Sequence, residues 1–252
     1  MIFFVALRKE MLEQWRTYRL LIVAVVFLVF GLLSPLLAKL TPELFKMLPQ
    51  GEEFARLVPP PTAADAVGQY VKNLSQFGVI LAVLMGMGAV AQEKDKGTAA
   101  LMLVKPMPRW AFLAAKHVAL AITFLVGIIL ASLAGYYYTL ILFEPLDIGG
   151  WLALNALLLL FSFVYVALTL FSSTLSKSQV VAGGLAFVFL ILLAILGALP
   201  AVGQYLPGQL LTSGTALASG TGSMSWGALL LSLGLIVAAL AGSWAIFQRQ
   251  EL

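Results

Sequence analysis

The sequence predicts an all-α integral membrane protein with six transmembrane helices. Hydrophobic residues make up 62% of the 252 residues, charged residues make up only 10%, and the mean hydropathy is +1.02. A soluble domain would carry roughly a quarter charged residues. Six charge-free runs are long enough to cross a bilayer, because a helix rises about 1.5 Å per residue. The absence of cysteine excludes disulfides and thiol chemistry.

The chain begins with an amphipathic helix, predicted over residues 2–19, that lies in the membrane interface rather than crossing it. Apolar residues recur at helical spacing and charged residues fill the other side. A cleaved signal peptide is a poor alternative, because the charges follow the first apolar run. The apolar side holds Phe3, Phe4, Leu7, Met11, Trp15 and Tyr18. The charged side holds Arg8, Lys9, Glu10, Glu13, Arg16 and Arg19.

The six spans follow in order. They are predicted over residues 20–38, 73–91, 117–142, 151–175, 180–199 and 225–247. Before the second span, Thr41-Pro42 predicts the start of a short helix, and Thr62 with Asp65 predicts a capping box that begins another. Residues 200–224 are uncharged and rich in Gly, Ser and Thr. They are either an outer loop or a re-entrant element shielded from lipid.

The most basic stretch covers residues 92–116, between the second and third spans. Residues 98–104 within it can form two helical turns, roughly 10 Å in length. Gly97 precedes this segment, and Pro106 and Pro108 end it. We expect a short, partly apolar helix at the membrane surface that needs a partner for its apolar side. An ordinary basic loop, which membrane topology alone requires, is the alternative.

Charge bias predicts the orientation. With six spans both termini share one side, and that side holds eleven of the fifteen Lys and Arg residues. The bias places both termini and the 92–116 stretch in the cytoplasm. The eleven are Arg8, Lys9, Arg16, Arg19, Lys94, Lys96, Lys105, Arg109, Lys116, Lys177 and Arg249.

The chain carries few signs of chemistry of its own. It has no GxxxxGK[ST] nucleotide loop, no HExxH, no GxSxG and no GxGD. A single histidine, His117, cannot build a histidine-rich metal site. The predicted spans contain no Asp, Glu, Lys or Arg, which argues against a pump driven by ion coupling. No basic face interleaved with aromatic residues is present, which argues against nucleic-acid binding.

The 92–116 stretch also has a recognisable pattern of residues. It carries an acidic residue, a Gly-Thr pair, two leucines, a proline, an arginine and a final lysine. These are Glu93, Gly97-Thr98, Leu101, Leu103, Pro106, Arg109 and Lys116. In this register the chain resembles the permease subunits of ABC-2 type transporters, in the branch of nitrous-oxide-reductase maturation and of drug or polysaccharide export. It departs from the family's pattern at Ala100, Pro108 and Ala115, where Glu, Ser and Gly are common.

The resemblance implies the permease subunit of an exporter in a prokaryotic plasma membrane. Residues 2–19 would be its elbow helix and residues 97–106 its coupling helix, on which a separate ABC ATPase docks. Two ATPase copies and a second permease copy, as a homodimer, would complete the assembly. The ATPases would bind ATP and Mg, and this chain would bind no cofactor or metal. A secondary carrier or channel, an intramembrane enzyme and a non-transporting assembly factor are the alternatives, and the substrate is left open.

Overall fold

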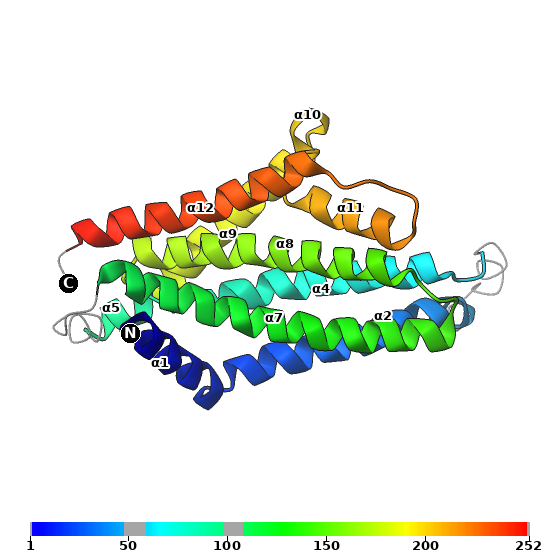
Figure 1. The fold of residues 1–252 in the computed structure, drawn as a ribbon, viewed down its shortest axis with the longest axis horizontal. Helices are drawn as coiled ribbons and strands as arrows, with labels where there is room; N and C mark the ends of the chain where they lie inside the picture. Colours follow the sequence, from blue (N-terminus) through cyan, green and yellow to red (C-terminus); the bar gives the residue numbers. More distant parts are fainter. Residues whose placement is uncertain (1, 48–58, 98–107, 251–252) are drawn as a thin grey trace.

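The computed structural model describes residues 2–47, 59–97 and 108–250, which fold into helices with no strand among them (Figure 1). Six helical segments in this part of the chain are long and apolar enough to cross a membrane. They are α2 (Arg19–Lys46), α4 (Ala63–Gly86) with α5 (Ala91–Asp95), α7 (Arg109–Leu142), α8 (Ile148–Leu175), α9 (Gln179–Gly197) and α12 (Trp226–Arg249). The shorter helices are α1 (Ile2–Arg16), α10 (Pro200–Gly203) and α11 (Gly208–Ala218). The predicted all-α fold with six spans is confirmed.

The centre of the bundle is formed by α2, α4, α7 and α8, which pack along one another. Phe27 on α2 and Phe124 on α7 are fully buried, with ring centroids 5.7 Å apart. Helices α2 and α7 approach closely because small residues face each other. A Cβ atom at Gly31 would lie 2.7 Å from the backbone oxygen of Ala131, so only glycine fits there.

Hydrogen bonds between side chains join the central helices. The Tyr70 hydroxyl on α4 donates to Asn155 Oδ1 on α8 at 2.6 Å, and both residues are buried. Asn73 Nδ2 on α4 donates to Ser34 Oγ on α2 at 2.9 Å. In hydrocarbon such polar groups must be paired, so these bonds fix which helix faces meet.

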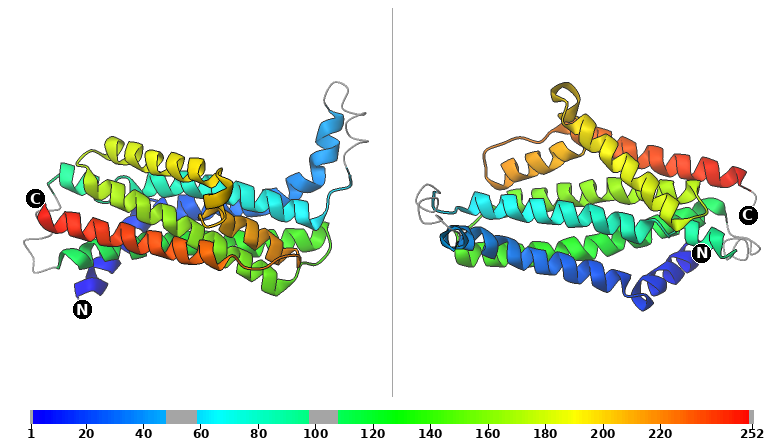
Figure 2. Two further views of the ribbon diagram at one scale, coloured as in Figure 1. Left: turned by 90° about the horizontal axis from the view of Figure 1, so that it is seen from above. Right: turned by 180° about the vertical axis from the view of Figure 1, so that it is seen from behind.

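Helices α9, α11 and α12 cover one side of this centre, next to α8 (Figures 1 and 2). Helix α11 lies against α8, and Leu210, Ser213, Gly214 and Ala218 form its buried face. A Cβ atom at Gly150 would lie 2.3 Å from the Leu217 backbone oxygen, so the contact is tight. Residues 200–224 therefore include two helices, of which α11 packs on the bundle, and whether the segment is re-entrant or an outer loop stays a prediction.

Two helix boundaries differ from those predicted. Helix α2 continues through Pro42 to Lys46, and Thr41 does not start a new helix because its hydroxyl donates back to the Leu37 carbonyl at 2.8 Å. Helix α7 begins at Arg109 rather than at residue 117, after Pro108 in an extended conformation. The predicted capping box is confirmed, with Thr62 and Asp65 exchanging bonds at the start of α4.

The two ends of the chain lie at the same end of the bundle. Helix α1, helix α5 and the last turn of α12 meet there, as Figures 1 and 2 show. We refer to it as the α5 end. The flanks of residues 98–107 are at this end too, because residue 97 follows α5 and residue 108 precedes α7.

Candidate functional site at the α5 end

The site residues predicted for the 92–116 stretch fall into two groups. Thr98, Leu101, Leu103 and Pro106 lie outside the described residues, so the predicted coupling helix at residues 97–106 stays a prediction. Glu93, Gly97 and Arg109 are described, and they lie on the two flanks of this segment.

Glu93 belongs to a cluster of four charged side chains. Lys116 Nζ lies 3.1 Å and 3.2 Å from the two carboxylate oxygens of Glu10, and 2.8 Å from Glu93 Oε1. Lys9 Nζ lies 2.9 Å from Glu93 Oε1 and 3.0 Å from Glu10 Oε1. The four residues, which we call the ionic cluster, come from α1, α5 and α7. They therefore tie three helices together.

The ionic cluster pairs opposite charges around a buried lysine. Only 3% of the Lys116 side chain and 8% of the Glu10 side chain are exposed. Removing a charge from water costs several kcal/mol, and an opposite charge with good geometry must offset this. Burial alone would lower the pKa of Lys9, but the Glu10 carboxylate and the bonds to Glu93 outweigh burial and raise it. The ammonium groups of Lys9 and Lys116 thus face the carboxylates of Glu10 and Glu93, and Lys9 also contacts Glu13 at 3.4 Å.

These carboxylates also have the spacing of a cation site. Ligand atoms of Glu10, Glu13 and Glu93 lie within 4.8 Å of one another. The ammonium groups of Lys9 and Lys116 contact the same oxygens, at 2.8–3.4 Å. A metal ion would have to displace both lysines, so the donor set fits ion pairing better than metal binding.

Arg109, on the other flank, holds the end of α12. Its Nη1 donates to the carbonyl oxygens of Phe247 at 2.6 Å, Gln248 at 2.8 Å and Gln250 at 3.0 Å. The last carbonyls of a helix have no partner within the helix, and a guanidinium can satisfy several at once. The Phe112 ring stacks on Phe247 with centroids 5.3 Å apart. The start of α7 and the end of α12 are thereby joined.

The end of α8 supports the preceding flank. The Lys94 ammonium donates to the Thr174 carbonyl. The Ser173 hydroxyl donates to the Met87 carbonyl at 2.8 Å and accepts from the Val90 and Ala91 amides at 3.0 Å each. Ser173 therefore satisfies backbone groups left open where α4 ends and α5 begins.

Gly97 ends α5 with a backbone that suits glycine. Its φ is +66°, in the left-handed region that other residues rarely adopt, and its amide donates to the Lys94 carbonyl at 3.1 Å. A Cβ atom there would meet no atom within 4 Å. The requirement for glycine at this position is thus conformational rather than steric.

Helix α1 packs on α7 with a polar face inward. Its buried residues are Ala6, Glu10 and Gln14, while Phe4 and Trp15 are 70% and 66% exposed. Leu7 and Met11 are half-buried. These exposures are compatible with the predicted contact between the apolar side and lipid. Glu10, predicted on the charged side of the helix, is buried against the bundle.

Three features of the site were not predicted from the sequence: the buried face of α1, the burial of Lys116 and the role of Ser173. Ala6, Glu10 and Gln14 recur every four residues, a spacing that places them in one stripe along a helix and could have indicated a packed face. The burial of Lys116 and the role of Ser173 have no such signal. Both depend on partners that are distant along the chain, Glu10 for Lys116 and Met87 for Ser173.

Comparison with known proteins shows the family of the chain. The ABC-2 family transporter protein pattern matches residues 5–252. The chain is also 25% identical over 175 residues to the uncharacterized transmembrane protein YxlG of Bacillus subtilis (strain 168), covering 68% of this chain and 67% of that protein. The six helices that are long enough to span a membrane agree with a multi-pass membrane protein. The matched family consists of transporter components. The chain therefore belongs to the ABC-2 family of transporter proteins.

Proposed function

We propose that this chain is the permease subunit of an ATP-driven exporter, moved by a separate ABC ATPase that docks on residues 97–106. The ATPase would bind ATP and Mg, and this chain would supply the membrane path. The proposal rests on family membership and on the arrangement at the α5 end.

The observation that carries the proposal is the anchoring of both flanks of residues 98–107. Before the segment, Glu93 bonds to Lys116 on α7 and Lys9 on α1, and Lys94 bonds to the end of α8. After it, Arg109 bonds to the end of α12. A displacement of the segment would therefore act on α1, α7, α8 and α12 together. A docking point for an external motor needs such stiff connections, whereas a simple connecting loop does not.

The proposed orientation puts the α5 end in the cytoplasm of a prokaryotic plasma membrane. Eleven of fifteen Lys and Arg residues are predicted on that side. An intracellular ATPase could reach the 97–106 segment only in this orientation. The active assembly would contain two permease copies, as a homodimer, and two ATPase copies.

Co-purification tests the proposal directly. The full chain is expressed with a candidate ABC ATPase from the same organism, solubilised, and purified through a tag on this chain only. We expect the ATPase to co-purify and its ATP hydrolysis to be inhibited by vanadate. Transport activity of this chain alone, without any ATPase, would contradict the proposal and favour a secondary carrier or an intramembrane enzyme.

A further inference from the structure

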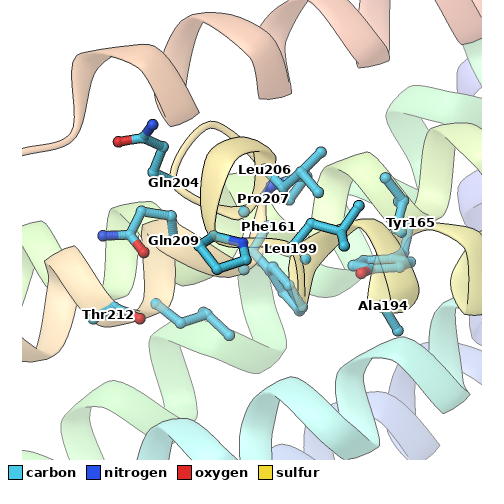
Figure 3. A pocket seen from close by; sticks show the side chains of 15 residues that line it. Phe161, Tyr165, Ala194, Leu199, Gln204, Leu206, Pro207, Gln209 and Thr212 are labelled. Carbon is cyan, nitrogen blue, oxygen red and sulfur yellow. The ribbon is translucent and has the colours of Figure 1, made fainter.

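A cavity of about 590 Å³ lies between α8, α9, α10 and α11 (Figure 3). Phe161 and Tyr165 on α8 form an aromatic wall, with ring centroids 4.9 Å apart. Figure 3 shows Gln204, Gln209 and Thr212 gathered on one side of the cavity, and Leu199, Leu206 and Tyr165 on the other. The cavity thus has a polar side of amide and hydroxyl groups and an apolar side.

A second cavity of about 460 Å³ shares part of its lining with the first. It lies between α4, α8 and α9, and Phe161, Tyr165 and Ala194 line both cavities. Its other walls are mainly apolar, from Phe77, Val79, Ile80, Phe187 and Leu190, with Ser75 and Gln76 as the polar members. The two cavities are neighbours along α8, and we refer to them together as the groove; Gln204, Gln209 and Thr212 lie at its α10–α11 end.

The residues lining this groove carry no formal charge. The lining contains no Asp, Glu, Lys, Arg or His, and its polar groups are amides and hydroxyls. An ion bound there would lose part of its hydration without gaining an opposite charge, which is costly. A neutral head group can bond to Gln204, Gln209 and Thr212 while an apolar tail lies on the aromatic wall. Volumes of this size are typical of small-molecule sites.

We infer that the groove binds an uncharged amphiphile, with a hydroxyl or amide head group at the α10–α11 end and a single alkyl chain along α8. This inference rests on the proposed transport function and deepens it, because it names the class of cargo. The head group would take the polar side of the first cavity, and the chain would extend into the second.

The test uses photolabelling of the purified full chain in lipid nanodiscs. The probes are diazirine-bearing hexadecanol, the matching hexadecanoic acid, and the matching quaternary ammonium compound. We expect saturable labelling of peptides from α8, α9 and α11 by the alcohol only. Labelling of the same peptides to the same extent by all three probes would overturn the inference, since it would indicate ordinary lipid contact.

Glycine variants separate the groove from the surrounding lipid surface. Gly197 and Gly208 line the first cavity, and a Cβ atom at either would meet no atom within 4 Å. Gly197→Leu and Gly208→Leu should each fill the cavity and reduce saturable labelling at least about tenfold. Gly184→Leu is the matched control, because Gly184 is exposed on α9, is equally unobstructed, and lines neither cavity.

Each outcome of the labelling bears on one proposal only. Two independent filling variants are used, and size-exclusion profiles show which of them are folded. A folded variant that keeps full labelling would overturn the site. Co-purification of the ATPase is measured on the same samples. Retained ATPase binding with absent labelling would reject the cargo site alone, and absent ATPase binding with specific labelling would reject the proposed motor alone.

Discussion

The ammonium group of Lys116 lies between two carboxylates, 3.1 Å from Glu10 Oε1 and 2.8 Å from Glu93 Oε1. Glu10 belongs to the first helix of the chain, and Glu93 lies just before the segment on which the ATPase is proposed to dock. This one side chain therefore connects helix α1, helix α7 and the base of that segment.

Replacing Lys116 with methionine should destabilise the protein strongly. The substitution keeps the length of the side chain but removes the ammonium group that both Glu10 and Glu93 contact, and breaking a buried pair typically costs about 3–5 kcal/mol. Unfolding by SDS titration and melting in detergent measure the loss. Lys46→Met is the control, since Lys46 pairs with Glu43 on the surface and such pairs contribute about 0–1 kcal/mol. Similar losses in both variants would contradict the assigned role of Lys116.

Replacing Arg109 with glutamine should loosen the end of α12. The guanidinium bonds to three carbonyls there, and a hydrogen bond to a charged group contributes about 1.5–3 kcal/mol. Hydrogen exchange should therefore become faster over residues 244–250. Residues 63–70, at the opposite end of the bundle, serve as the internal control. A uniform increase across both regions would mean general destabilisation rather than a local anchor.

Replacing Ser173 with alanine should weaken the junction of α4 and α5. The change leaves the Met87 carbonyl and two amides without their shared partner, and each such group costs about 1–3 kcal/mol if it stays buried. Ser172→Ala is a matched control, because the Ser172 hydroxyl bonds only within its own helix, to the Leu168 carbonyl. We expect a lower melting temperature for Ser173→Ala than for Ser172→Ala. The reverse order would refute the role given to Ser173.

Replacing Leu101 and Leu103 together with aspartate should abolish association with the ATPase. Charged side chains would oppose an apolar docking contact, while the membrane fold should stay intact because the substitutions lie outside the spans. The control is Leu44→Asp with Met47→Asp, two exposed apolar residues at the opposite end of the bundle. Unchanged co-purification of the leucine variant would remove the docking assignment.

The sequence predicted those features that depend on local composition. Spans follow from charge-free runs of sufficient length, and the capping box follows from Thr62 and Asp65 at the required spacing. The start of α7 was harder to predict from the sequence, because the charge of Lys116 indicated a polar segment before the third span. Lys116 can be buried there because the carboxylates of Glu10 and Glu93, both distant along the chain, neutralise it.

The site was predictable to a smaller extent. Glu93 and Arg109 were identified through the family pattern, yet nothing in their neighbourhood indicates that one bonds to α1 and α7 and the other to α12. The groove along α8 could not be predicted from the sequence either. Its walls come from α4, α8, α9 and the 200–224 segment, and only the packing of that segment brings Gln204 and Gln209 over Phe161.

Helix α9 is attached to the bundle through its first half. Ala182, Gly183 and Ala186 are buried, whereas residues 187–197 are exposed or half-buried. This exposed second half of α9, residues 187–197, forms a wall of both cavities. A small tilt of α9 about its small-residue base would therefore widen both cavities together toward the surrounding hydrocarbon. The proposed amphiphile could then enter sideways from the leaflet, without ever passing through water.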